Sequence, residues 1–449
     1  MKKIFQYIML AVVTIVMASC TSDIEETTAT TGKNNVQLVV GEFPAFGDSQ
    51  TRAIGTPDEG KTSWAEGDEL ILEIAKTSYG RHSATFTYNG KSWELTSGEL
   101  VYLEGDPAYI PHVYYAPNYK WEAGKLVLKE GKDPGTDEYI EENARITGNS
   151  ETITVSFAEA TRKYSRLRIA TLPNEQITVD TEYFTPAGSS DMEQEGNYTL
   201  TSDEKGNAYL YGTFENNSEV TVKYREAALT TYTFSQATES AKSYALDATV
   251  ISANSSEEIK SAIEQKVADG KTTIRLNLAP NAGTNEFMAI REAIKGAAPN
   301  DLGTIELTII GVETIPEEAF YKMLQLKSVR MSDVKEIKKY AFKECQYLTV
   351  VEAPSLNKLY SGAFKKCDQL SKLTFGPINY ADARNWPIFE YITPNIDLIL
   401  SDYQKEMIET DSYLYTANND RDYAGSDEHN SKNFLGREFR SITCRYKVK

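Results

Sequence analysis

Apolar and polar residues follow two different patterns along the chain. Between Val36 and about residue 249, apolar residues alternate with polar ones in short runs separated by Gly, Pro, Asn and Asp, which is the pattern of half-buried β-strands. Asn89-Gly90 lies between two such runs and predicts a hairpin. Strands at intervals of about ten residues are typical of β-sandwiches, so we expect two in tandem, over residues 36–157 and 158–249.

A 22-residue repeat replaces this alternation between residues 311 and 376. Its central phrase occurs three times, as AFYKM (319–323), AFKEC (341–345) and AFKKC (363–367). Seven apolar columns stay in register with this phrase. A single copy cannot enclose a core, whereas stacked copies bury a continuous one. The period therefore predicts a short leucine-rich repeat solenoid, about four or five strands across.

Helical spacing of apolar residues precedes the repeats. The stretch SSEEIKSAIEQKVADG has Ser255 or Ser256 as its N-cap and Gly270 after its end, and NEFMAIREAIKGA predicts a second helix. Strand-like runs, TTIRLNLA and TIELTII, follow the two helices. We expect residues 250–310 to form an α/β cap at the N-terminal end of the solenoid, and residues 377–449 to form its C-terminal cap.

The first twenty residues are MKKIFQYIMLAVVTIVMASC. Lys2 and Lys3 precede an apolar stretch that is too short to span a membrane comfortably, which predicts a signal peptide over residues 1–19. Residues 20–35 are polar, acidic and rich in Thr, so we expect a disordered tether there.

The end of the predicted signal peptide resembles a lipobox. In that motif the cysteine is lipidated and becomes the mature N-terminus, which implies lipidation of Cys20 here; an ordinary signal peptide with an incidental cysteine is the alternative. Asp23, Glu25 and Glu26 follow directly and resemble the surface-export signal of Bacteroidetes lipoproteins. The two resemblances imply a lipid-anchored protein that faces outward from the outer membrane.

Charge is distributed unevenly. The net charge of −18 argues against a nucleic-acid partner and against binding to an anionic membrane surface. Residues 310–375 contain 11 Lys and Arg but only 8 Asp and Glu, so the repeats are locally basic. This asymmetry supports a domain boundary before the repeats.

Residues that commonly carry catalysis or bind metals are scarce. The chain has three His and four Cys, none with zinc-site spacing, and it lacks GxSxG, P-loop and GxGxxG motifs. The acidic segment DRDYAGSDE (420–428) departs from a calcium loop because Ala424 stands where a ligand is needed. We therefore expect no metal, no cofactor and no enzymatic activity. The enzyme alternative requires a pair of carboxylates in a deep cleft.

Several stretches of the β-rich half resemble the fimbrillin-like proteins of Bacteroidales. They are Thr51-Arg52, WAEGDELIL (64–72), FTYNGKSWEL (86–95), VYYAPNY (113–119) and ITVSFAEATRKYSRLRIA (153–170). The resemblance covers about residues 36–249 and implies two transthyretin-like β-sandwiches, with fimbrial subunits as partners. It also implies proteolytic maturation at Arg52, although we favour a solvated loop arginine at that position. The C-terminal domain stands where that family has its donor strand, which argues against ordinary polymerisation.

The AFxxC phrase resembles the BspA-like class of bacterial surface leucine-rich repeats. This resemblance implies that the Phe of each copy fills the interior of its coil and that the Cys lies behind the strand turn. Cys345 and Cys367 would lie about 5 Å apart, one repeat spacing, so a disulfide is sterically feasible. We favour buried free thiols that act as small apolar groups. We assign no role to Cys444.

Residues between the apolar columns of the repeat strands should form an exposed face. Such faces bind proteins or glycans, and a plain solvated surface is the alternative. The candidate ligand face comprises Lys327, Ser328, Arg330, Thr349, Glu352, Ser371, Lys372 and Thr374. We expect the remaining lysines to lie elsewhere and to promote solubility, namely Lys338, Lys339, Lys343, Lys365 and Lys366.

These features together predict a non-enzymatic lipoprotein on the surface of the outer membrane. It would be an adhesin or a fimbria-associated accessory subunit that binds protein or glycan ligands of host or bacterial surfaces through the solenoid. The alternative is a glycan-capture lipoprotein of a polysaccharide-uptake system. Exposed aromatic rings would favour that alternative, and the cluster Tyr114, Tyr115 and Tyr119 is the candidate.

Overall fold

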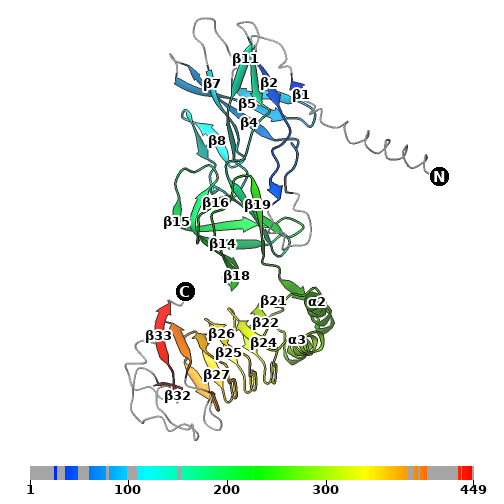
Figure 1. Ribbon diagram of the computed structural model, residues 1–449, viewed down its shortest axis with the longest axis vertical. Helices are drawn as coiled ribbons and strands as arrows, with labels where there is room; N and C mark the ends of the chain where they lie inside the picture. Colours follow the sequence, from blue (N-terminus) through cyan, green and yellow to red (C-terminus); the bar gives the residue numbers. More distant parts are fainter. Residues whose placement is uncertain are drawn as a thin grey trace, which may run out of the picture. The chain divides into compact units, whose positions relative to one another are not determined.

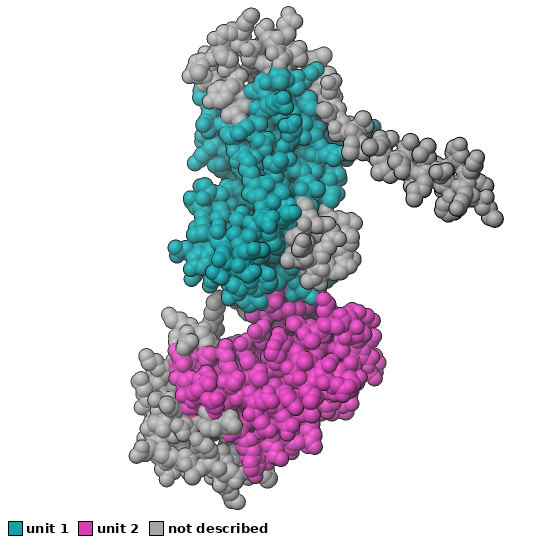
Figure 2. Space-filling model, viewed as in Figure 1, with its two compact units in different colours: residues 1–221, 231–247 teal, residues 222–230, 248–449 magenta. Residues whose placement is uncertain are grey.

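The structure of the chain is a computed structural model that is mainly β (Figure 1). It describes residues 25–27, 36–48, 60–76, 80–98, 109–148, 153–225, 227–253, 255–382, 388–392, 395–401, 433–435 and 437–446. Residues 1–221 with 231–247 form one compact unit, unit 1, and residues 222–230 with 248–449 form the other, unit 2 (Figure 2). In the part that the structure describes, no helix is long and apolar enough to cross a membrane. Cys20, Arg52 and the acidic segment 420–428 lie outside the described residues.

Two sheets share the first core of unit 1. One has the order β1 (Glu25–Thr27), β2 (Val36–Val40), β12 (Ile153–Phe157) and β11 (Arg145–Gly148). The other has the order β10 (Ile140–Asn143), β7 (Tyr109–Tyr115), β4 (Glu69–Lys76), β5 (Gly80–Tyr88) and β6 (Trp93–Gly98). One apolar cluster contains Leu38 and Val155 from the first sheet and Phe86, Trp93 and Val113 from the second. The alternating pattern therefore buries one face of each sheet, as predicted.

Strand β1 changes one expectation for the N-terminal segment. It pairs antiparallel with β2, with Glu25 opposite Val40, so the prediction of a disordered tether over residues 20–35 is wrong at residues 25–27. The edge of β2 offers unpaired backbone N–H and C=O groups. A polar segment can satisfy them through its main chain alone, without burying any apolar side chain.

A larger sheet contains most of the remaining strands of unit 1, together with residues 222–230 of unit 2 on β17 and β18. Its order is β18 (Ala227–Thr233), β17 (Glu219–Tyr224), β14 (Gln176–Pro186), β16 (Asn207–Phe214), β13 (Ser165–Ala170), β19 (Lys242–Asp247) and β3 (Gly47–Asp48), with β15 (Glu193–Thr201) paired to β14. Strand β3 follows β2 closely in sequence but pairs parallel with β19, so that Gly47 lies opposite Lys242. A small hairpin joins β8 (Tyr119–Glu122) to β9 (Lys125–Leu128). The predicted domains 36–157 and 158–249 thus lie largely within unit 1.

Unit 2 is organised by parallel strands. Its larger sheet has the order β20 (Ile251–Ala253), β21 (Thr273–Leu278), β22 (Ile305–Ile310), β24 (Leu326–Arg330), β26 (Val350–Ala353), β28 (Lys372–Phe375), β30 (Asp397–Ser401) and β33 (Ser441–Tyr446). A second parallel sheet has the order β23 (Thr314–Ile315), β25 (Glu336–Ile337), β27 (Lys358–Tyr360) and β29 (Tyr380–Asp382). Strands β31 (Asn433–Phe434) and β32 (Arg437–Glu438) form a hairpin.

The predicted helices and the strands that follow them are confirmed. Helix α2 spans Ser256–Ala268 and begins after Ser255, whose hydroxyl accepts the Glu258 N–H at 3.3 Å. Helix α3 spans Thr284–Ala297, and the Glu286 carboxylate accepts the Gly283 N–H at 2.8 Å. Both helices contribute to the apolar cluster that continues through the repeats, which links the α/β segment to the repeat core.

One buried phenylalanine occupies the same place in each coil. The rings of Phe320, Phe342, Phe364 and Phe389 stack at centroid distances of 5.1, 5.4 and 5.7 Å. Cys345 and Cys367 are buried free thiols, as expected. Their Sγ–H groups donate to the carbonyls of Phe320 and Phe342, each at 3.0 Å. These contacts connect each coil to the previous one, and burial raises the pKa of Cys345 to about 12.

The repeats extend further than the sequence pattern indicated. The larger sheet continues on both sides of the predicted repeats: β20, β21 and β22 lie in the segment predicted as the N-terminal cap, and β30 and β33 lie in the segment predicted as the C-terminal cap. The coil at Phe389 keeps the left-handed backbone of the others, since Tyr391 has φ 60° where Glu344 and Lys366 have 63° and 58°. Extra residues between β28 and Phe389 break the 22-residue spacing, which hides this coil from a search by period.

Candidate functional site

The candidate ligand face, called the strand face below, lies on and beside β24, β26 and β28. Parallel pairing brings Arg330 of β24 opposite Glu352 of β26, and Glu352 opposite Thr374 of β28. Val329, Val351 and Leu373 alternate with these residues and are buried. The structure therefore brings the charged members of the predicted face into one row across neighbouring coils.

Every cation of the strand face meets a carboxylate. Arg330 Nε lies 2.9 Å from Glu352 Oε2, and Lys372 Nζ lies 3.9 Å from Glu352 Oε1. Lys327 Nζ lies 2.7 Å from the carboxylate of Glu306 on β22, a residue that our prediction missed. Exposed ion pairs of this kind contribute only about 0–1 kcal/mol each, so a charged ligand can replace them.

Two hydroxyl groups of the predicted face have structural partners. Thr349 Oγ1 donates to the carbonyl of Lys327 at 2.8 Å, and Ser371 Oγ donates to the carbonyl of Thr349 at 3.1 Å. These bonds join each coil to the one before it. Ser328 and Thr374 are half-buried on their strands. The charged residues are thus better placed than Thr349 and Ser371 to contact a ligand.

The row of charges continues beyond the predicted face. On β30, Asp397 accepts hydrogen bonds from Arg440 Nε at 2.8 Å and from Ser441 Oγ at 2.7 Å. The hydrogen bonds from Arg440 and then Ser441 lower the pKa of Asp397 to about 2. The irregular spacing after β28 concealed this pair. A 22-residue offset with reversed charge reveals the pair Arg330 and Glu352, but Asp397 and Arg440 are 43 residues apart and do not have this offset.

The lysines assigned to solubility lie against tyrosines. Lys343 Nζ is 5.0 Å from the ring centroid of Tyr321 and 4.7 Å from that of Tyr340. Lys339 Nζ is 4.8 Å from the Tyr340 centroid. Lys365 and Lys366 lie over Tyr391, and Lys338 lies over Tyr360 beside the carboxylate of Glu336. Tyr340 contacts lysines of its own coil, whereas the other contacts join neighbouring coils, which the spacing of residues along the chain does not reveal.

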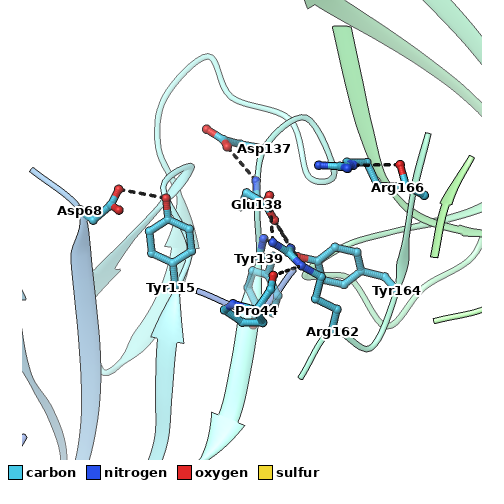
Figure 3. Close-up of polar contacts among 10 residues, drawn as sticks. Pro44, Asp68, Tyr115, Asp137, Glu138, Tyr139, Arg162, Tyr164 and Arg166 are labelled. Carbon is cyan, nitrogen blue, oxygen red and sulfur yellow. Dashed lines mark hydrogen bonds and ion pairs between the residues drawn. The ribbon is translucent and has the colours of Figure 1, made fainter. Parts of the chain in front are cut away.

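A buried charged cluster joins three segments of unit 1 (Figure 3). Arg162 forms a two-pronged ion pair with Glu138, and its Nε donates to the carbonyl of Pro44 at 2.8 Å. Its Nη1 donates to Tyr164 Oη at 3.1 Å, and its guanidinium lies 3.9 Å from the centroid of Phe46. Each of these partners restrains the same buried cation, so we interpret the cluster as structural.

Burial shifts the carboxyl groups around this cluster. It raises the pKa of Glu138, an effect that Arg162 opposes, and it also raises the pKa of Asp137. Asp137 Oδ1 accepts the backbone N–H of Glu138 at 2.7 Å. Shifted carboxyls can indicate catalysis. Here, however, Glu138 is fully engaged by Arg162. Among the described residues, no group of three or more His, Cys, Asp and Glu side chains could hold a metal ion.

The tyrosine cluster considered for stacking on sugars is buried. Tyr114, Tyr115 and Tyr119 are only 8%, 3% and 8% exposed. Tyr114 Oη donates to Glu73 at 3.0 Å, and Tyr115 Oη donates to Asp68 at 3.1 Å (Figure 3). The expectation of an exposed aromatic cluster at these positions is therefore wrong. The core shared by the two sheets encloses Tyr115, whereas Tyr114 and Tyr119 pack with Ile71 in a separate apolar cluster.

A cavity of about 390 Å³ opens on unit 1. Its wall combines aromatic rings and hydroxyl groups with one residue of each charge, including Tyr139, Glu141, Lys163, Thr185, Ser189 and Thr213. The volume lies within the range of small-molecule sites, about 300–1,000 Å³. The wall residues come from strands and loops far apart in sequence, so no motif predicts this cavity.

Comparison with known proteins identifies the repeat region. Residues 302–410 match the family described as BspA type leucine rich repeat region, in six copies. The predicted BspA-like repeats are therefore confirmed, and the match extends beyond residues 311–376 in both directions. No curated protein and no solved structure matches the chain.

Proposed function

We propose that this protein is a non-enzymatic, lipid-anchored protein of the outer-membrane surface whose strand face binds a protein or glycan of a host or bacterial surface. The observation that carries this proposal is the row of exposed charges on parallel coils within the BspA-type repeats. Parallel strands place equivalent side chains about 4.8 Å apart, which suits an extended ligand surface. Since the ion pairs are weak individually, their exchange for ligand contacts has a small energetic penalty.

The finer architecture that we propose is a stalk followed by a recognition head. The stalk consists of tandem, transthyretin-like β-sandwiches of fimbrillin-like type, and the head is a solenoid capped at both ends. The core shared by two sheets in unit 1 supports the proposed β-sandwich stalk. The continuous apolar cluster from α2 to Phe439 supports the proposed solenoid head. A fimbrial accessory role, lipidation at Cys20 and processing at Arg52 remain proposals drawn from sequence resemblance.

A charge swap on the strand face tests the proposed function. The full-length chain is screened against arrays of extracellular-matrix proteins and glycans, and the double variant Arg330→Glu/Glu352→Arg is screened in parallel. The swap preserves the net charge and reverses the ion pair between positions 330 and 352, and it places a cation instead of a carboxylate beside Lys372. We expect at least a tenfold loss of affinity for any ligand bound by the strand face.

A second ion pair provides the matched control. Glu313 and Lys335 form an exposed pair beside β23 and β25, outside the strand face. The swap Glu313→Lys/Lys335→Glu should leave binding unchanged. Equal losses in the two double variants, or no ligand for the unsubstituted chain, would contradict the proposed recognition by the strand face.

The alternative function is glycan capture by a polysaccharide-uptake system, and the cavity in unit 1 is the observation that favours it. Its hydroxyl groups and the ring of Tyr139 are suited to a small, neutral sugar. Under this alternative, neutral oligosaccharides bind to the chain, and Thr185→Val weakens that binding whereas the strand-face swap has no effect.

A further inference from the structure

A second face of the repeats differs in chemistry from the strand face. It consists of side chains on the turns around each AF phrase, and we call it the turn face: Tyr321, Lys322, Lys339, Tyr340, Lys343, Lys365, Lys366 and Tyr391. Hydrogen bonds join these turns from coil to coil. The N–H of Lys322 donates to the carbonyl of Lys343 at 3.0 Å, and that of Phe342 donates to Ala363 at 2.8 Å. The side chains therefore form columns that follow the repeat.

The turn face positions its aromatic rings by backbone geometry. Gly362 has φ 61°, and a Cβ atom there would lie 2.5 Å from Cε1 of Tyr340. The absence of a side chain at Gly362 thus lets the Tyr340 ring lie against the next coil. That ring is in contact with both Lys339 and Lys343. Tyr391, on the last coil of this face, is 54% exposed.

Two lysines of the turn face, Lys339 and Lys366, differ from the cations of the strand face because they contact tyrosine rings rather than carboxylates. A tyrosine ring attracts an ammonium group but carries no net charge that would neutralise it. Glu344 lies near Lys322 and Lys343, at 3.6 and 3.9 Å, and Glu390 pairs with Lys365 at 2.5 Å. Within the described ranges, the contacts of Lys339 and Lys366 are with rings, and no carboxylate lies within ion-pair distance of them.

Helix α3 adds positive charge beside the first turn. Arg291 Nη1 donates to the carbonyl of Glu318 at 2.9 Å. Burial, followed by the positive charges of Arg291 and Lys322, lowers the pKa of Lys295. Acidic residues are also present on the first coil, at Glu317 and Glu318, so the excess of positive charge lies on the later turns.

We propose that the turn face binds an acidic polysaccharide, a linear glycan that carries sulfate or carboxylate groups. Lys343 and Lys365 occupy equivalent positions on neighbouring coils, about one 4.8 Å strand spacing apart, and Lys322 and Lys366 occupy equivalent positions two coils apart. A polymer with regularly placed anions can follow these positions. Lysine binds these groups as a compact charge without bidentate geometry. Tyrosine rings supply flat apolar faces for the sugar. On a chain of net charge −18, a polyanion is attracted to this face and repelled elsewhere.

This inference goes beyond the proposed function because it assigns a separate surface and a ligand class. It does not depend on the strand face, on Cys20 or on Arg52. Failure of one proposal is therefore distinguishable from failure of the other, because the Arg330→Glu/Glu352→Arg variant should retain binding to the acidic polysaccharide.

Dextran sulfate and uncharged dextran are the probes, since they share one backbone and differ in charge. The full-length chain should bind dextran sulfate and not dextran, and binding should weaken as salt rises because counterions are released on contact. The double variant Lys339→Gln/Lys366→Gln should lose affinity by about fivefold per lysine, or about 25-fold together. The control Lys335→Gln/Lys358→Gln changes net charge equally at exposed lysines off the turn face and should retain binding.

The tyrosine ring has its own pair of variants. Tyr340→Phe keeps the ring and should bind dextran sulfate as the unsubstituted chain does. Tyr340→Leu removes the ring and should weaken binding about threefold, because Lys339 and Lys343 lose the surface that orients them.

Four results would overturn this inference. They are equal binding of dextran, unchanged binding by Lys339→Gln/Lys366→Gln, equal loss in the lysine control, and equally tight binding of poly-glutamate or anionic lipid vesicles. The last result would assign the turn face to an acidic protein or to a membrane surface instead. Circular dichroism of each variant establishes that the fold is intact before binding is measured.

Discussion

The phenylalanine column of unit 2 and the aromatic cluster around Trp64 in unit 1 bury their rings in different ways. In unit 2, Phe342 stacks between Phe320 and Phe364 with ring planes only 21° and 8° apart. In unit 1, Trp64 meets Phe43, Trp93 and Tyr115 at 85°, 85° and 86°, nearly edge-on. A repeated coil presents the same ring in the same orientation each time, whereas converging strands bring unlike rings together from several directions.

The ion pairs of the two units differ in the same way as their aromatic rings. Arg162 and Glu138 form a buried ion pair in unit 1 that is not part of any repeat. In unit 2, Arg330 and Glu352 remain partly exposed and belong to a row that continues from coil to coil. The repeat core of unit 2 therefore depends on equivalent side chains that recur in successive coils, whereas the core of unit 1 depends on contacts between individual residue pairs. Substitutions in the two cores should therefore have effects of different kinds.

The largest expected effect is that of Phe342→Ala in the repeat core. Removing this fully buried ring leaves a cavity between two stacked neighbours and should lower the free energy of unfolding by about 3–5 kcal/mol. Hydrogen exchange followed by mass spectrometry should show faster exchange in peptides from residues 302–382. Peptides from residues 60–98 of unit 1 should be unchanged.

Phe342→Leu is the matched control for this prediction. It keeps most of the buried volume and should have less than half the effect of the alanine variant. Equal acceleration of exchange in both units would show that the two cores are not energetically separate. The comparison between them would then fail.

A similar or slightly smaller loss is expected for Arg162→Met in unit 1. The substitution leaves Glu138 buried without its partner and should destabilise the chain by about 3 kcal/mol. The double variant Arg162→Met/Glu138→Leu removes both charges and should recover most of that stability. Urea unfolding monitored by circular dichroism measures all three. A double variant no more stable than Arg162→Met would show that the pair contributes through packing rather than through charge.

The smallest expected effects are those of two aspartates with opposite pH dependence. Burial raises the pKa of Asp137 in unit 1, so its contribution to stability is complete below about pH 4 and is lost as pH rises through its folded pKa. Arg440 and Ser441 lower the pKa of Asp397 in unit 2 to about 2, so its contribution is present above about pH 4 and is lost as pH falls toward 2.

Asparagine variants separate these two signs. Asp137→Asn should stabilise the chain at neutral pH, because it removes a buried charge. It should have little effect at low pH, where the Asp137 carboxyl is already neutral. Asp397→Asn should destabilise it modestly at neutral pH, since the ion pair with Arg440 is solvent-exposed. Urea unfolding at several pH values measures both. The exposed substitution Asp301→Asn is the control, and the same sign for both aspartates would contradict the prediction.

The elements with regular spacing were predictable in detail. The limits of α2 and α3, the phenylalanine column and the alternation along β24, β26 and β28 all follow from period and capping residues. The exposed charges of the strand face were identified for the same reason, because each lies between two apolar columns. Glu306, the carboxylate partner of Lys327, was missed because it lies on β22, which precedes the first AF phrase.

Features that join segments distant in sequence were not predictable. Strand β3 pairs with β19, and Arg162 meets both Pro44 and Glu138, although no motif relates these positions. Tyr114 and Tyr115 were predicted as candidate exposed rings. They are adjacent on β7, so their side chains point to opposite faces of the sheet, and each hydroxyl group donates to a buried or partly buried carboxylate. Burial on both sides of one strand depends on which segments cover the sheet.

The sequence by itself determined the class of each half of this protein: alternating strands up to about residue 249, and stacked 22-residue coils with an interior phenylalanine after it. These properties are local or periodic, so side-chain spacing is enough to specify them. Only the tertiary structure decided which charges meet, since the Arg162–Glu138 pair, the ion pairs of the strand face and the contact of Lys343 with Tyr321 join different strands or coils. Such contacts depend on packing in three dimensions, and the spacing of residues along one chain does not specify them.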